Sequence, residues 1–338
     1  MIRLKDVAER AGVSVMTVSK VLRNAPDVSA QTKTRIRRLA DEMGYVPDSL
    51  AQGLRTRTTK LFGVVVSAVT NPTAAPMIMA IEERAHDLGY DLLLAHSLND
   101  PEREESCLRK ILARRVDGLF VVPVYRLAPT APIYEDLKRK GPPVVLLGPA
   151  APFCEPFSSV ETEDQPASYT LVKHLLDLGH RRIAFFAGPP SAPWSRSRRE
   201  GYHQGLREAG LKDDDNLIFT AGSTIEDGQK AALQMLNEGV HATAIQAVND
   251  QVAIGAANIL LQQGLQIPRD ISVVGFGNIF LSEHFRVPLT TIGQPQYRLG
   301  LAAAEVMFEL LRGGKPRTRT FPGELILRAS SGPPPSKR

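Results

Sequence analysis

The chain has 338 residues, of which 43% are hydrophobic and 23% charged, the composition of a globular protein long enough for two or three domains. No run approaches the roughly 20 consecutive apolar residues that cross a bilayer, and the first residues lack the apolar core of a signal peptide, so we expect a cytoplasmic protein without a membrane anchor. Residues 1–60 contain 12 Lys and Arg against 6 Asp and Glu, whereas the remainder contains 29 against 30. This basic head indicates a polyanion partner, most often nucleic acid, although a solvated basic surface has the same composition.

The basic head has the pattern of three short helices. Residues 4–11 carry apolar side chains at helical spacing and are followed by Gly12, which predicts a first helix that ends there. Ser14 is a helix N-cap and begins a second helix over 15–22, so the two helices are separated by a short turn, as in a helix-turn-helix. A third helix follows Ser29, another N-cap.

One face of the second helix points away from the predicted core. Met16, Lys20 and Arg23 lie on this face, with Ser19 beside them and Val15 at its boundary. Lys20 can donate to guanine O6 and N7 in the major groove. Val15 and Met16 offer only apolar contact, for example with a thymine methyl, or else they complete the core of the head. We expect Arg23 to bind phosphate rather than a base.

From residue 61 onward, short β-rich runs alternate with helical stripes. The runs occupy residues 61–66, 91–95, 118–122 and 144–147 in a first series, and 182–186, 243–248 and 271–276 in a second. Continuous apolar runs of this length are typical of buried parallel strands. The sequence therefore predicts two successive α/β halves.

An ordered set of motifs resembles the LacI/GalR family of bacterial repressors. The motifs are Leu4-Lys5-Asp6-Val7-Ala8, Ala11-Gly12-Val13-Ser14, Thr17-Val18-Ser19 and Gly44-Tyr45-Val46-Pro47, and the likeness continues over nearly the whole chain. The resemblance implies a small all-α three-helix helix-turn-helix head and a hinge helix, followed by a two-lobed α/β body with parallel sheets, like that of periplasmic binding proteins. The corresponding boundaries are 1–46 for the head, 47–60 for the hinge helix and linker, 61–330 for the body and 331–338 for a disordered tail.

In such a body the chain crosses between the lobes three times, here near residues 160, 289 and 318. The N-lobe then comprises about 61–160 and 290–318, and the C-lobe about 161–289 and 319–330. The resemblance also implies an effector cleft between the lobes.

The resemblance implies which head residues meet DNA. Val15, Met16 and Lys20 hold the places of base contacts, and Ser14, Thr17 and Ser19 lie nearer the phosphates. Leu54 holds the place of a hinge leucine that is wedged into the minor groove, although residues 56–60 also fit a plain linker. Because one helix-turn-helix reads only a half-site, we expect a homodimer on a pseudo-palindromic double-stranded operator.

Ligands of open α/β sheets bind beyond the carboxyl ends of the strands, so the segments that follow the predicted strands are candidate cleft lining. These segments and the family motifs select Ser67, Asn71, Trp194, Arg196, Arg198, Asn249, Gly277 and Gln294 as candidate effector-binding residues. Three alternatives remain open at this stage. Asn249 also suits a plain helix N-cap. Arg198 is equally suited to a structural pairing in the cleft wall, and Trp194 to a partly exposed place in a loop.

The expected cleft departs from sugar-binding relatives at three places. Gly148 and Gly277 stand where such relatives commonly have Asp, and Thr73-Ala74 stands where they have an aromatic residue. Without those acids, Arg196 and Arg198 would make the cleft positive. We therefore expect an acidic or phosphorylated small molecule, or a larger glycoside, rather than a free hexose.

The sequence contains no HExxH, GxSxG or P-loop motif, and its seven histidines lack metal-ligand spacing, so we expect no catalytic residue, no metal and no cofactor. The predicted function is that of a sequence-specific transcriptional regulator, a repressor by its resemblance, whose operator affinity depends on a carbohydrate-related metabolite. Two alternatives are a regulator controlled by a protein partner that docks on the body, and a binding protein without catalytic activity.

Overall fold

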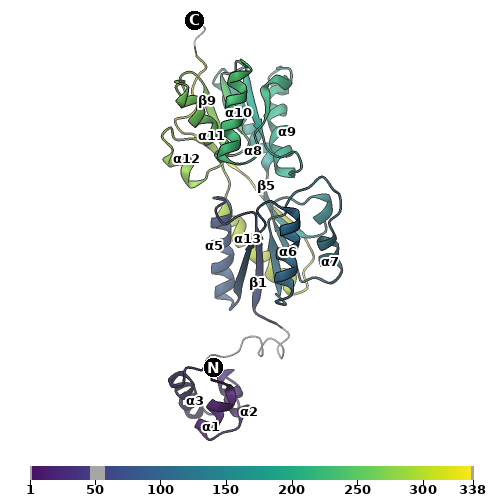
Figure 1. The fold of residues 1–338 in the computed structure, drawn as a ribbon, viewed down its shortest axis with the longest axis vertical. Helices are drawn as coiled ribbons and strands as arrows, with labels where there is room; N and C mark the ends of the chain where they lie inside the picture. The colour runs from purple at the N-terminus through teal and green to yellow at the C-terminus, as the bar shows by residue number, and fades with distance from the viewer. Residues whose placement is uncertain (1, 46–57, 336–338) are drawn as a thin grey trace. The chain divides into compact units, whose positions relative to one another are not determined.

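The computed structural model describes residues 2–45 and 58–335, and the chain divides into two compact units, 1–59 and 60–338 (Figure 1). Leu54, the proposed minor-groove wedge, lies outside the described residues.

The N-terminal unit is a bundle of three helices, α1 (Leu4–Ala11), α2 (Val15–Leu22) and α3 (Ala30–Glu42). Ser14 and Ser29 cap α2 and α3, because each hydroxyl accepts a hydrogen bond from the backbone N–H three residues later. One small core joins the helices and consists of Val7, Ala8, Ala11, Val18, Val21, Ile36 and Ala40. The predicted three-helix helix-turn-helix head is confirmed.

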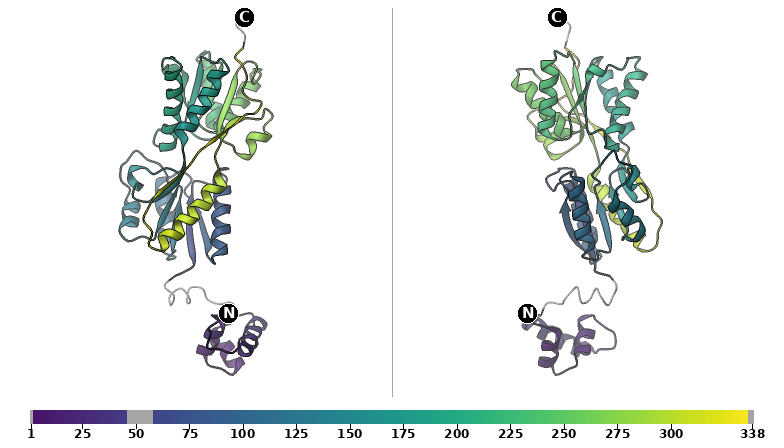
Figure 2. Two further views of the ribbon diagram at one scale, coloured as in Figure 1. Left: turned by 180° about the vertical axis from the view of Figure 1, so that it is seen from behind. Right: turned by 45° about the vertical axis from the view of Figure 1, so that its right-hand side comes forward.

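The N-lobe of the body is a six-stranded parallel sheet with helices on both faces. Its strands have the order β11-β5-β4-β3-β1-β2 and comprise β1 (Leu61–Val66), β2 (Asp91–His96), β3 (Gly118–Val121), β4 (Val144–Leu147), β5 (Ser158–Thr162) and β11 (Thr318–Phe321). Helix α5 (Ala74–Asp87) packs on one face beside α13 (Gln296–Leu311), which comes from late in the chain (Figure 2). Helices α6 (Pro101–Leu112) and α7 (Pro132–Lys140) cover the other face.

The C-lobe repeats this architecture. Its sheet has the order β12-β10-β9-β8-β6-β7 and comprises β6 (Ile183–Ala187), β7 (Ile218–Thr220), β8 (Ala244–Ala247), β9 (Ser272–Gly277), β10 (Thr290–Gly293) and the antiparallel edge strand β12 (Glu324–Ile326). Helices α8 (Asp164–Asp177) and α9 (Pro193–Glu208) cover one face, and α10 (Ile225–Asn237) and α11 (Asp250–Gln262) the other. A short helix, α12 (Phe280–His284), follows β9. None of the helices in the described part of the chain is long and apolar enough to span a membrane.

The two-lobed α/β body with parallel sheets is confirmed, but the crossings lie later than expected. The chain leaves the N-lobe sheet after Thr162, returns to it after Gly293 and leaves it again after Phe321, instead of near 160, 289 and 318. The difference arises because β5, β10 and β11 all continue in their own sheets up to the crossings.

The prediction of a disordered tail over residues 331–338 is wrong for its first residues. The hydroxyl of Ser331 is hydrogen-bonded to His174, and the backbone of Gly332 binds both His180 and Ser272 of the C-lobe. These residues belong to the packed lobe because their polar groups complete hydrogen bonds of buried side chains.

His180 makes the stability of the body dependent on pH. Its buried ring is hydrogen-bonded to the Thr243 hydroxyl at 2.9 Å and to the Gly332 carbonyl at 2.8 Å, and burial lowers its pKa below the ordinary value of about 6.5. The unfolded chain then binds a proton that the folded chain does not. This contribution to stability is therefore fully present above about pH 6.5 and is lost progressively as the pH falls below that value through the lower pKa of the folded state.

We predict that the urea concentration that half-unfolds the body falls between pH 8 and pH 5.5, and that His180→Gln makes this fall smaller. His86→Gln, which changes an exposed histidine, serves as the control and should leave the fall unchanged. An equally steep fall in His180→Gln would assign the pH dependence to other groups.

Candidate functional site

The outward face of α2 carries apolar side chains on the surface of the N-terminal unit. The side chain of Val15 is 44% exposed and that of Met16 is 65% exposed, so neither completes the core of the unit. Val18 and Val21 fill that role from the opposite face of the helix. Exposed apolar residues on a helix-turn-helix recognition helix are suited to contact with thymine methyl groups.

The polar candidates on α2 have partners within the unit. Ser14 accepts a hydrogen bond from the backbone N–H of Thr17, and the Nε of Arg23 donates to the carbonyl of Ser19. The ammonium of Lys20 donates to Asp27 at 2.5 Å, and this hydrogen bond lowers the pKa of Asp27. When Lys20 donates to a base, it must therefore either give up its hydrogen bond to Asp27 or keep that bond and donate a second one.

A cavity of about 600 Å³ lies between the lobes of the body, beside the first and second crossings. Its size falls within the usual range for small-molecule sites. Six of the predicted effector-binding residues line it, namely Ser67, Asn71, Trp194, Arg198, Asn249 and Gln294.

Two predicted residues, Arg196 and Gly277, are not among the residues that line this cavity. On α9, Trp194 and Arg198 are four residues apart and share a face, whereas Arg196 is rotated by about 200° from Arg198 and is exposed. Its guanidinium donates to the carbonyl of Pro190 instead. Gly277 ends β9, and the cavity wall is formed beside it by Phe276 and Ile279.

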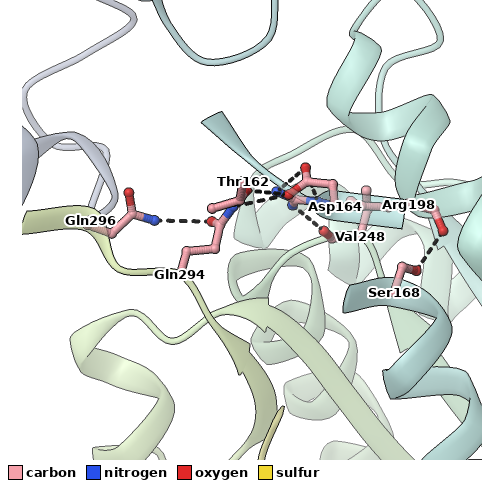
Figure 3. A network of polar contacts seen from close by, with 7 residues as sticks. All are labelled: Thr162, Asp164, Ser168, Arg198, Val248, Gln294 and Gln296. Atoms are coloured by element: carbon pink, nitrogen blue, oxygen red, sulfur yellow. Dashed lines mark hydrogen bonds and ion pairs between the residues drawn. The ribbon is translucent and has the colours of Figure 1, made fainter. Parts of the chain in front are cut away.

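Arg198 is a buried residue that lines the cavity, and each of its three guanidinium nitrogens has a partner within the protein. Figure 3 shows these contacts. Its Nε and Nη2 bind one carboxylate oxygen of Asp164 at 3.0 and 2.9 Å, and its Nη1 donates to the carbonyl of Val248 at 2.7 Å. The guanidinium also lies over the ring of Phe276, 3.7 Å from its centroid. The structural pairing left open for Arg198 is therefore present, and the residue also lines the cavity.

Asp164 connects Arg198 to two of the crossings. The hydroxyl of Thr162, at the end of β5, donates a hydrogen bond to Asp164. Gln294, which follows β10, donates to the Thr162 hydroxyl at 2.6 Å and accepts from Gln296 at 3.1 Å (Figure 3). One polar network therefore joins the cavity wall to the first and second crossings.

Asn249 and Asp250 begin α11 at the C-lobe side of the cavity. The side chain of Asn249 caps the helix by accepting from the N–H of Val252, and its amide donates to the carbonyl of Ser223. Asp250 is buried, and burial raises its pKa, although Thr291 and other donors bind the carboxylate. The N-cap alternative for Asn249 therefore describes its hydrogen bonds, although the residue also lines the cavity.

The lining does not carry the positive charge that the sequence predicted. Arg198 is the only cationic residue among the lining residues, and it is paired with Asp164; the lining also contains Glu161, Asp227 and Asp250. The lining therefore gives no support to the expected acidic or phosphorylated effector, because an anion would meet an excess of carboxylates.

The two glycines that replace acids have a backbone reason. Gly148 has φ of +130° and Gly277 has φ of +135°, a region that residues with a Cβ atom rarely adopt. A Cβ at Gly148 would also lie 3.0 Å from the hydroxyl of Tyr125. The backbone at these two positions therefore favours glycine whatever the charge of the ligand.

The lining residues that sequence reasoning missed include Tyr125, Glu161, Asp164 and Asp227. Asp164 and Asp227 lie in the first turns of α8 and α10, each of which begins at a connection between strand and helix. A search for acids at helix starts would have found these two, because the carboxyl ends of parallel strands and the N-termini of the following helices share one edge of the sheet. Within residues 2–45 and 58–335, no cluster of three or more His, Cys, Asp or Glu is suited to a metal ion.

The buried ion pair of Asp164 and Arg198 leads to a prediction about the stability of the body. Asp164→Asn leaves the Arg198 charge buried without its counter-charge, so the free energy of unfolding of the body should fall by about 3 kcal/mol. Urea unfolding of the full chain measures this change.

Asp136→Asn is the matched control, because Asp136 forms an exposed ion pair with Arg139 and its loss should change the free energy by less than about 1 kcal/mol. The double variant Asp164→Asn/Arg198→Met should recover part of the loss, since it removes the uncompensated charge. If Asp164→Asn unfolds at the same urea concentration as the parent, the pair contributes nothing to stability.

Comparisons with known proteins agree with both units. The family model of bacterial regulatory proteins, lacI family, matches residues 3–48, and that of the periplasmic binding protein-like domain matches residues 172–331. The transcriptional repressor PurR of Photobacterium profundum is 32% identical over 339 residues, which cover 98% of each chain.

Two solved structures resemble the whole chain. The Lac repressor dimer bound to operator and the anti-inducer ONPF has a TM-score of 0.86 at 30% identity and covers 98% of this chain and 99% of its own. The complex of the transcriptional regulator CelR with cellobiose has a TM-score of 0.74 at 27% identity and covers 98% and 100%. The chain therefore belongs to the LacI family and is a DNA-binding transcriptional regulator with an effector-binding body, not an enzyme.

Proposed function

We propose that the chain is a cytoplasmic repressor that binds a pseudo-palindromic operator as a homodimer, with α2 of each copy in the major groove. The exposed Val15 and Met16 supply apolar contacts and Lys20 supplies a donor for guanine. Ser14, Thr17, Ser19 and Arg23 lie close to them on or beside the same helix and bind the phosphates in this proposal. The dimeric state is proposed by likeness to the Lac repressor dimer on its operator.

The effector in this proposal is a small, hydroxylated molecule bound between the lobes. The observation that carries it is the cavity of about 600 Å³, whose wall comes from both lobes and from the crossings. Amide and hydroxyl groups of Asn71, Thr73 and Gln251 suit the hydroxyls of a sugar, and Trp194 suits its apolar face. The solved complex of CelR contains such a compound, cellobiose.

A ligand that contacts both lobes favours one angle between them. In the dimer, a change of this angle alters how the two N-terminal units are presented to DNA, and a coupling of about 1–3 kcal/mol is enough to change operator occupancy. The proposal does not need a protein partner on the body, because the cavity itself provides the second site.

Selection from a pool of random duplexes with the full chain should enrich a pseudo-palindromic operator. Lys20→Ala should then relax the preference at one base pair in each half-site by about 1–3 kcal/mol, because a bidentate donor to guanine is lost. Lys5→Ala removes the same charge from an exposed position on α1 and should weaken binding equally on all sequences. If Lys20→Ala keeps the full base preference, Lys20 is not a base contact, and if no palindrome is enriched, the repressor proposal fails.

The effector proposal is tested by thermal-shift screening of the full chain against sugars, amino sugars, sugar acids, sugar phosphates and nucleosides. A compound that stabilises the folded chain should also change operator affinity. Trp194→Ala should weaken its binding, because the ring lines the cavity, whereas Arg196→Ala on the opposite face of the same helix should leave binding unchanged. Tight binding by Trp194→Ala, or a loss in Arg196→Ala, would contradict the arrangement of α9 in the site.

A further inference from the structure

The carboxylates around the cavity differ in how they are satisfied. Asp164 binds Arg198, Thr162 and Gln294. Asp227 accepts from the backbone N–H groups of Ser223 and Thr224, both at 3.1 Å. Asp250 accepts from the hydroxyls of Thr291 and Ser282 and from the N–H of Ile279. All three acids are therefore engaged in holding the walls of the cavity.

Glu161 is the exception. Glu161 is half-buried near the end of β5 and lines the cavity, yet its carboxylate makes no hydrogen bond or ion pair with any described residue. Burial, together with the nearby charge of Asp164, raises the pKa of Glu161. A carboxylate that is partly removed from water and accepts no hydrogen bond is unfavourable. A hydrogen-bond donor on a bound molecule would therefore offset part of its desolvation free energy.

The one cation in the described cavity wall, Arg198, is already neutralised by a carboxylate of the protein. The Nε, Nη1 and Nη2 of Arg198 are bound to Asp164 and to the carbonyl of Val248, and no other lysine or arginine lines the cavity. A carboxylate or phosphate on the ligand would therefore meet Glu161 without a free counter-charge.

We propose that Glu161 is an effector contact that accepts hydrogen bonds from the ligand, and that it selects a neutral polyol or a protonated amine, such as an amino sugar, against an anionic analogue. This inference rests on the proposed function, since it names the chemistry of the ligand in the same cavity. Vicinal hydroxyls donate to both carboxylate oxygens, and an ammonium adds a charge-assisted hydrogen bond. The remaining wall supplies the amide groups and the Trp194 ring that orient the ligand.

The test uses the full chain and two matched series that differ in the charged group, namely glucose, glucosamine and glucuronate, and galactose, galactosamine and galacturonate. Thermal shift finds the members that bind, and titration calorimetry measures their affinity. We expect a neutral or amino member to bind and its uronate to bind at least tenfold more weakly. Glu161→Gln should weaken the binding of that neutral or amino member about tenfold or more, the worth of a hydrogen bond to a charged group.

Glu163→Gln is the matched control, because Glu163 is exposed two residues further on and does not line the cavity. It should bind like the parent. Glu161→Gln should melt at or above the melting temperature of the parent, since it removes a carboxylate without a partner. A clear drop would reveal a structural role for the carboxylate and would overturn the assignment.

Three binding results would also overturn it: a uronate that binds most tightly, an affinity of Glu161→Gln within twofold of the parent, or no binding by any neutral or amino member. An anionic compound that controls operator binding would overturn the role of Glu161 and leave the proposed regulator intact. If no compound of the larger effector panel changes operator binding, the proposed function itself fails.

Discussion

The buried ion pair between Asp164 and Arg198 is the interaction on which the geometry of the body depends. Asp164 begins α8 immediately after the first crossing, and Arg198 extends from α9, so the pair fixes the start of one helix against the next. A buried charge is tolerated only with a counter-charge and hydrogen-bond partners. Asp164 supplies the counter-charge, and together with the Val248 carbonyl it gives each guanidinium nitrogen a partner. The pair can therefore change position only as a unit.

One hydrogen-bond network belongs both to the crossings between the lobes and to the cavity wall. Thr162 and Gln294 bring the first and second crossings to Asp164, while Arg198 stacks on Phe276 in the cavity wall. A ligand that presses on this wall, or that draws the N-lobe toward it, acts on groups that also define the angle of the crossings. Coupling between ligand and lobe angle then needs no separate relay through the core, because the binding surface and the hinge share one hydrogen-bond network.

The elements and their order could be predicted from local patterns, since amphipathic stripes, apolar strand runs and caps such as Ser14 are written in consecutive residues. Helical periodicity could also have predicted which side chains of α9 share a face, because a periodicity of 3.6 residues per turn separates Arg196 from Trp194 and Arg198. The family motif alone selected both arginines as effector contacts. What the sequence could not reveal was pairing across the fold. Nothing near Arg198 in the chain indicates that Asp164, 34 residues earlier, neutralises it.

The charge of the cavity was misjudged for a reason that applies to α/β proteins generally. At the strand ends Gly148 and Gly277 replace acids, which suggests a positive cavity, but helix starts meet the same edge of each sheet. Asp164, Asp227 and Asp250 all lie in first turns, where backbone N–H groups and the helix dipole favour a carboxylate. Acids at such positions are explained by the helices that carry them. Glu161 lies on a strand instead, without N–H groups to satisfy it, so its place in the cavity wall has no explanation within the lobe and points to the ligand.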